Sequence, residues 1–198
     1  MRVRGFAFLL LSALIAGCSP ASSASFDASA PCTADARLPG AYPELEALIP
    51  RTFEGRAPTR LDSGRNCTPT SLGTLAAAGF REIHFAGGLW ELGQRSGVTL
   101  AVLAAHGLTA EQVIDFYEAG ARSARKTENV KRGVYDFDGV NAVTVETLND
   151  ESFQTIVAWQ APQANTVRVA LVASDVREVS EKAEHQRRID AATRAFLR

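Results

Sequence analysis

The second half of the chain alternates between apolar and polar residues, and this period of two constrains the fold more than any other feature. The alternation indicates four β-strands, which cover residues 134–137, 143–145, 153–159 and 167–171. Asp138-Gly139 separates the first two strands and is typical of a two-residue hairpin turn. Asn149-Asp150 and residues 162–165 supply the next two turns. Because such short loops join antiparallel neighbours, this region predicts an antiparallel meander.

Two other stretches repeat with the period of 3.6 residues that is typical of amphipathic helices. The first begins with the capping box Thr109-Ala110-Glu111-Gln112. Its apolar stripe consists of Val113, Phe116, Tyr117, Gly120, Ala121 and Ala124. The second starts near Asp175 and runs to Phe196. Its inward residues are Val179, Ala183, Ile189, Ala192 and Phe196.

The region before Thr109 predicts short helices and three further strands. Thr68 and Pro69 are typical of a helix N-cap and first helical position, and Gly79 ends that helix. The other predicted elements are a helical turn at 43–48, an edge strand at 52–61, and strands at 80–86 and 98–102. We therefore expect an α+β fold, with a largely antiparallel sheet of about six or seven strands covered by two or three amphipathic helices. The order of the predicted strands and helices along the chain resembles the topology of the Mog1/PsbP-like folds.

The N-terminus has the composition of an export signal. The basic stretch Met1-Arg2-Val3-Arg4 precedes Phe6 to Ala16, in which only Ser12 is polar. As a helix this apolar run would extend roughly 16 Å, about half of a ~30 Å hydrocarbon core. It is too short to span a membrane and predicts the apolar region of a signal peptide.

The five residues that follow the signal region carry a family resemblance. Leu14-Ile15-Ala16-Gly17-Cys18 resembles the lipobox of bacterial lipoproteins. In that family the cysteine thiol receives a diacylglyceryl group, signal peptidase II cuts before the cysteine, and the new amine is often acylated, for example with palmitate. The resemblance implies a signal peptide at 1–17 and a lipid on Cys18 that anchors the protein in the cell envelope. Ser19, in place of the aspartate that retains lipoproteins in the inner membrane, favours the outer membrane in an organism that has one.

The segment that follows Cys18 is predicted to be a tether. Residues 18–37 are poor in large apolar side chains, and the thirteen residues 19–31 would span roughly 20 Å as a flexible chain. The folded domain would then comprise residues 38–198 and lie close to the membrane surface. The alternative is a secreted protein that is cut after Ala24 or Ala30, which would discard Cys18.

Once Cys18 is assigned to the lipid, two cysteines are left. Cys32 and Cys67 form an even pair in an exported domain, which favours a disulfide bond. Closing a loop of about 35 residues would stabilise the fold by roughly 3–4 kcal/mol. Two separate thiols are the alternative. A zinc site is disfavoured because no CxxC spacing is present.

The charge balance argues against a nucleic-acid partner. The formal net charge is −1, and loss of Arg2 and Arg4 with the leader lowers it to −3. No basic surplus is left to bind a phosphate backbone. No phosphate-binding glycine motif is present, so we expect no cofactor. The expected partners are the membrane, through the lipid, and an envelope protein or small-molecule ligand.

Few residues suggest catalysis or binding. His84, His106 and His185 show no metal-ligand spacing, and all three are expected at the surface or in loops. His106 is the best ligand candidate of the three, because it precedes the helix entry Gly107-Leu108-Thr109, where backbone N–H groups could meet an anion.

Trp90 is the second candidate for ligand or partner contact. It lies in the glycine-interrupted stretch 87–97, in which Gly87 and Gly88 predict a turn before the next strand. An exposed Trp90 would mark a contact patch, whereas a buried one would belong to the core. Asp136 to Asn141 faintly resembles a calcium loop, but the hairpin explains its Asp138-Gly139, and we expect no metal.

These observations favour a non-catalytic, membrane-anchored binding module of the cell envelope, with no catalytic residues assigned. Two alternatives are an envelope enzyme that uses His84 or His106 with a carboxylate, and a structural envelope protein. A binding module predicts an apolar cleft between sheet and helix. An enzyme predicts a cleft that holds a histidine with a perturbed pKa and a partner.

Overall fold

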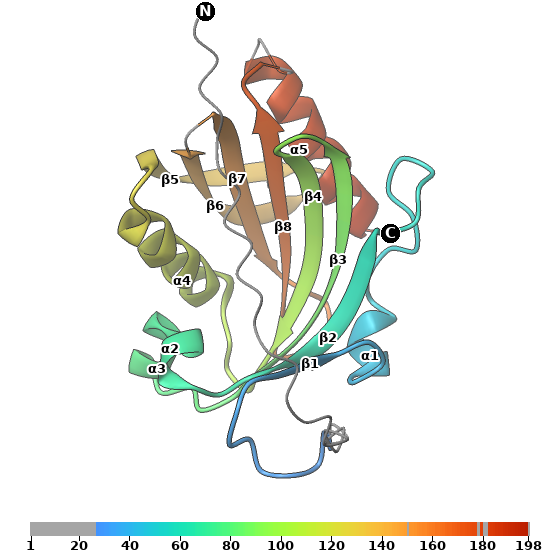
Figure 1. Cartoon of the computed structure of the whole chain (residues 1–198), viewed down its shortest axis with the longest axis vertical. Helices are drawn as coiled ribbons and strands as arrows, with labels where there is room; N and C mark the ends of the chain where they lie inside the picture. Colours follow the sequence, from blue (N-terminus) through green and yellow to red (C-terminus); the bar gives the residue numbers. More distant parts are fainter. Residues whose placement is uncertain (1–26, 150, 178, 180–181, 198) are drawn as a thin grey trace, which may run out of the picture.

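A computed structural model describes residues 27–149, 151–177, 179 and 182–197, and these form an α+β fold (Figure 1). Its strands are β1 (Ala36–Leu38), β2 (Arg60–Asn66), β3 (Ile83–Gly93), β4 (Ser96–Ala104), β5 (Thr127–Phe137), β6 (Val140–Asn149), β7 (Ser152–Gln160) and β8 (Thr166–Asp175). Its helices are α1 (Pro43–Glu46), α2 (Pro69–Leu72), α3 (Thr74–Ala77), α4 (Ala110–Ser123) and α5 (Lys182–Leu197). The predicted fold class is confirmed in its coarse form. The counts differ, since the described residues form eight strands and five helices, three of which have only four residues. The predicted signal peptide and Cys18 lie outside the described residues.

All eight strands belong to one sheet and pair antiparallel. Their order across the sheet is β1-β2-β3-β4-β8-β7-β6-β5. Strands β1 to β4 follow one another along the chain, and so do β5 to β8, so the sheet consists of two meanders that join where β4 pairs with β8. Helix α4 connects the two meanders.

Helices cover both faces of the sheet and produce two separate cores. On one face, α2, α3 and α4 pack against an apolar cluster that includes Val113, Ile114 and Val169. On the other face, α1 and α5 pack against a cluster that includes Trp159 and Phe196. Figure 1 shows α4 with α2 and α3 on one side of the curved sheet and α5 on the other. Among the described residues, no helix is both long and apolar enough to cross a membrane.

The turn in the glycine-interrupted stretch does not fall at Gly87 and Gly88. Strand β3 continues through both residues, and the turn falls at residues 94–95. Gly88 is required for close packing, because a Cβ atom there would lie 2.8 Å from the ring of Trp90 and 3.0 Å from Ile49 Cγ2. The prediction failed because it assigned a close-packing glycine to a turn.

The predicted edge strand at 52–61 is also wrong for most of its length. Strand β2 begins only at Arg60, and before it Phe53 and Arg56 pair across a tight turn. Glu54 and Gly55 have φ angles of 49° and 75°, which bend the chain back at this point.

The two best local predictions are confirmed. Asp138 and Gly139 have φ angles of 51° and 80°, as the type I′ hairpin between β5 and β6 requires. At the start of α4, Thr109 and Gln112 form the complete capping box.

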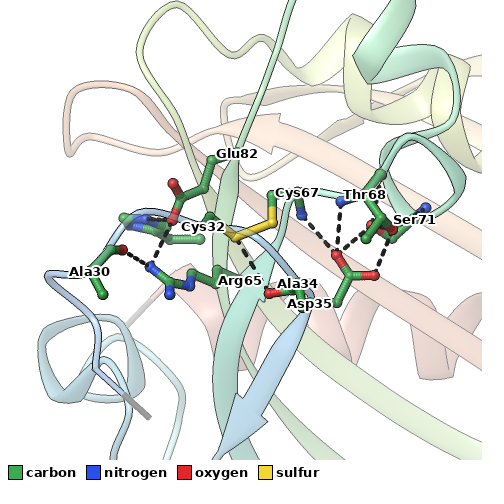
Figure 2. The surroundings of a disulfide bond; sticks show 10 residues. Ala30, Cys32, Ala34, Asp35, Arg65, Cys67, Thr68, Ser71 and Glu82 are labelled. Carbon is green, nitrogen blue, oxygen red and sulfur yellow. Dashed lines mark hydrogen bonds and ion pairs between the residues drawn. A yellow bond between two sulfur atoms is a disulfide. The ribbon is translucent and has the colours of Figure 1, made fainter.

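The predicted disulfide bond between Cys32 and Cys67 is present, and it ties the segment before β1 to the start of α2 (Figure 2). Beside it, the carboxylate of Asp35 accepts hydrogen bonds from the backbone N–H groups of Cys67 and Thr68 and from the hydroxyls of Thr68 and Ser71. Burial alone would raise the pKa of Asp35, but these hydrogen bonds outweigh burial and hold the pKa at about 2. The disulfide and Asp35 together hold the three-residue β1 in place.

Candidate functional site

The face of the sheet that carries α4 is only partly covered. Helix α4 packs on β5, β6, β7 and β8, and beside it a cleft opens over β2, β3 and β4. We call this cleft, lined by Asp62, Phe85, Gly87, Leu89, Ala101 and Phe116 among others, the sheet cleft. Its volume is about 240 Å³.

Small side chains at the centre of the sheet cleft make its floor. Gly87 pairs with Ala101 in the register of β3 and β4, between the larger Phe85 and Leu89. A Cβ atom added at Gly87 would lie 3.5 Å from Ala101 Cβ, which is an ordinary contact distance. A larger side chain could therefore stand there without a clash, and the space above Gly87 belongs to the cleft.

Charged side chains stand at the mouth of the sheet cleft. Arg37 on β1 and Arg60 on β2 both pair with Asp62, at 3.8 and 3.3 Å. The guanidinium of Arg37 also lies over the ring of Phe85, 5.0 Å from its centroid. The disulfide and the Asp35 hydrogen bonds that fix β1 thus also position Arg37.

A second hollow lies along α4 and adjoins the first. It has a volume of about 610 Å³. We call it the α4 hollow, and its lining includes Gly73, Ala119, Gly120, Ile156 and Leu171. Phe116 and Tyr117 line both spaces and pack edge to face, with ring centroids 5.3 Å apart. These two rings therefore form the wall between the sheet cleft and the α4 hollow.

Tyr117 is half-buried in this wall. Burial raises the pKa of its hydroxyl.

The structure brings two of the three candidate histidines together. His84 and His106 line a third hollow of about 360 Å³ with Glu82 and Asn165. His84 Nε2 lies 2.9 Å from Glu82 Oε1, and its ring stacks on Tyr42 at 4.4 Å between centroids. The described lining of this hollow contains no serine, threonine or cysteine that could serve as a nucleophile.

The backbone next to His106 does not offer the expected anion site. His106 itself is exposed. However, Gly107 N–H donates to Asn165 Oδ1 at 3.0 Å, Leu108 N–H to the carbonyl of Ala105 at 3.1 Å, and Thr109 N–H to Gln112 Oε1 at 3.0 Å. The turn and the capping box therefore use the N–H groups of Gly107, Leu108 and Thr109.

His185 is buried, which corrects the expectation of a surface histidine. Only 5% of its surface is exposed, and its two ring nitrogens lie 2.9 Å from Ser174 Oγ and Thr155 Oγ1. Burial is the main cause that lowers the pKa of His185 to about 4. Ser174 is fully buried, so this trio of polar side chains fits a packed core better than a reactive site.

Trp90 is buried too, with 2% of its surface exposed. Its indole Nε1 donates to the carbonyl of Arg56 at 2.9 Å, and its ring packs edge to face with Phe53. The alternative of an exposed Trp90 contact patch is therefore wrong, and the ring belongs to the core under α1.

No metal-binding cluster is found in the part of the chain that the structure describes. There, no three side chains of histidine, cysteine, aspartate or glutamate lie close enough together to hold a metal ion. Asp138 instead pairs with Arg194 of α5 at 3.6 Å.

Comparisons of the chain with protein-family models, curated proteins and solved structures gave no match. The binding-module hypothesis predicted an apolar cleft between sheet and helix, but it named none of the residues that line the sheet cleft. The predicted apolar stripe of α4 contains the rings of Phe116 and Tyr117, but only the register of β3 and β4 reveals the floor beneath them.

Proposed function

We propose that this chain is a bacterial lipoprotein, anchored through Cys18 to the extracytoplasmic side of the cell membrane or to the outer membrane. The support comes from the predicted signal sequence and from the resemblance of residues 14–18 to a lipobox. The disulfide bond agrees with this proposal, because such bonds form in oxidising compartments outside the cytoplasm.

We further propose that the folded domain is a non-catalytic binding module for a small apolar ligand. The observation that carries this proposal is the sheet cleft, in which Gly87 and Ala101 leave open space between the apolar side chains of Phe85, Leu89 and Phe116. Ligand sites in proteins are typically concave and lined by apolar and aromatic groups with a few polar ones. The adjoining α4 hollow gives a ligand further room beyond Phe116.

Photocrosslinking in native membranes tests this proposal. The probe is a neutral long-chain alcohol with a diazirine on its chain, and the labelled peptides of the full-length protein are mapped by mass spectrometry. We expect labels in β3, β4 and α4. Gly87→Val should reduce them strongly, because the added side chain fills the floor of the sheet cleft at an ordinary contact distance.

The matched control is Gly133→Val, which adds the same side chain on the distant edge strand β5. A Cβ atom there would lie 3.1 Å from Thr144 Oγ1, so that hydroxyl has to shift by a few tenths of an ångström. Labelling should stay unchanged in this control. Absence of labels from β3, β4 and α4 in the unmodified protein would contradict the proposed binding function.

A further inference from the structure

The mouth of the sheet cleft carries one net positive charge. Arg37 and Arg60 share the single carboxylate of Asp62. The side chain of Asp62 is 13% exposed, whereas those of Arg37 and Arg60 are 53% and 63% exposed. The carboxylate therefore lies beneath the two guanidinium groups, and the cations face the solvent at the entrance.

The guanidinium of Arg37 lies at the boundary between the solvent-exposed mouth of the sheet cleft and its apolar floor. The guanidinium of Arg37 lies 5.0 Å from the ring centroid of Phe85, and Phe85 lines the sheet cleft. This contact holds the charge in place while the exposed edge of the guanidinium keeps N–H donors available to a further acceptor. A molecule that enters the cleft thus meets a cation first and apolar surface next.

We infer that the ligand of the sheet cleft is a long-chain carboxylate, whose head pairs with Arg37 and Arg60 and whose chain lies against Phe85, Leu89 and Ala101. This inference rests on the proposed binding function and adds the chemical class of the ligand. The guanidinium fork is the side chain that best matches carboxylate geometry. One net positive charge balances one singly charged head, whereas a cationic head would be repelled.

The size of the sheet cleft favours a single chain. Its volume of about 240 Å³ lies below the roughly 300–1,000 Å³ that is usual for sites of drug-sized ligands. The α4 hollow, beyond Phe116 and Tyr117, offers space for the far end of a single chain.

Three probes with the same diazirine-bearing chain test the inference on the full-length protein in native membranes. They differ only in the head, which is a carboxylate, an alcohol or a trimethylammonium group. Labelling of the sheet cleft by each probe is normalised to its labelling of Gly87→Val. At low salt we expect the carboxylate to label the cleft about tenfold more than the trimethylammonium probe.

Arginine substitutions test whether Arg37 and Arg60 bind the carboxylate head. The double variant Arg37→Gln/Arg60→Gln should lower carboxylate labelling by about tenfold, to the level of the alcohol probe. Arg51→Gln, which removes an exposed arginine on the opposite face of the sheet, should change nothing.

The two proposals fail in different ways. Equal labelling of the sheet cleft by all three probes, unaffected by the arginine substitutions, would overturn the carboxylate inference and leave the binding function standing. Absence of cleft labelling with every probe would overturn both.

Discussion

His185 Nδ1 lies 2.9 Å from Ser174 Oγ, in a contact that is buried between α5 and β8. The other ring nitrogen lies 2.9 Å from the hydroxyl of Thr155 on β7. Two hydroxyls can satisfy a neutral imidazole, because each can donate or accept. Burial lowers the pKa of His185 to about 4, and the positive charges of Arg188 and Lys182 act in the same direction, while Glu146 opposes them.

The burial of His185 makes the free energy of unfolding depend on pH. Below pH 6.5 an unfolded chain binds a proton at His185, whereas the folded chain binds it only near pH 4, so the free energy of unfolding falls as the pH drops through this range. The loss should be on the order of 3 kcal/mol. Urea unfolding of the full-length protein between pH 7.5 and 4.5 measures this loss of stability.

His185→Gln should be less stable at pH 7.5 by about 1–2 kcal/mol, and its free energy of unfolding should fall less as the pH drops. An identical fall in both proteins would show that His185 does not cause it.

The disulfide bond should matter for the edge of the sheet more than for its centre. Cys32→Ser/Cys67→Ser should lower the free energy of unfolding by about 2–4 kcal/mol, because the unfolded chain loses a constraint over a sequence separation of 35 residues. Hydrogen exchange should rise first in residues 36–38, which the bond holds near β2. Reductant should reproduce both effects in the unmodified protein and have no effect on the double variant. Unchanged exchange at 36–38 would contradict the role given to the bond.

The lipid anchor has its own test. Cys18→Ala in the full-length chain should abolish incorporation of labelled palmitate and move the protein out of the membrane fraction, because no acyl chain is left to hold it. Ser19→Ala is the matched control and should stay lipidated. If Cys18→Ala remains in the membrane fraction, or if the mature N-terminus proves to be Ser25 or Pro31, the lipoprotein assignment is wrong.

Features that are determined by a few neighbouring residues could be predicted from the sequence. The hairpin at Asp138-Gly139 and the capping box at Thr109 need only local backbone geometry, and both are present. The pairing of Cys32 with Cys67 followed from the number of cysteines once Cys18 was set aside.

Features that depend on distant partners could not be predicted. His185 has the sequence neighbours of a surface residue, and its burial depends on Thr155, thirty residues away on strand β7. From the sequence alone, Gly88 is typical of a turn. Only the structure shows that the ring of Trp90 packs against it. The sheet cleft exists because Gly87 faces Ala101, a register that no local pattern specifies.

The most direct test of the central claim is to measure the mass of the protein together with any bound ligand. Full-length protein from native membranes, released gently and analysed by native mass spectrometry, should show a non-covalent adduct with the mass of a single-chain lipid. The adduct should be lost in Gly87→Val and kept in Gly133→Val. An unmodified protein that carries no adduct, or an adduct that survives equally in Gly87→Val, would contradict the claim that the sheet cleft is a ligand site.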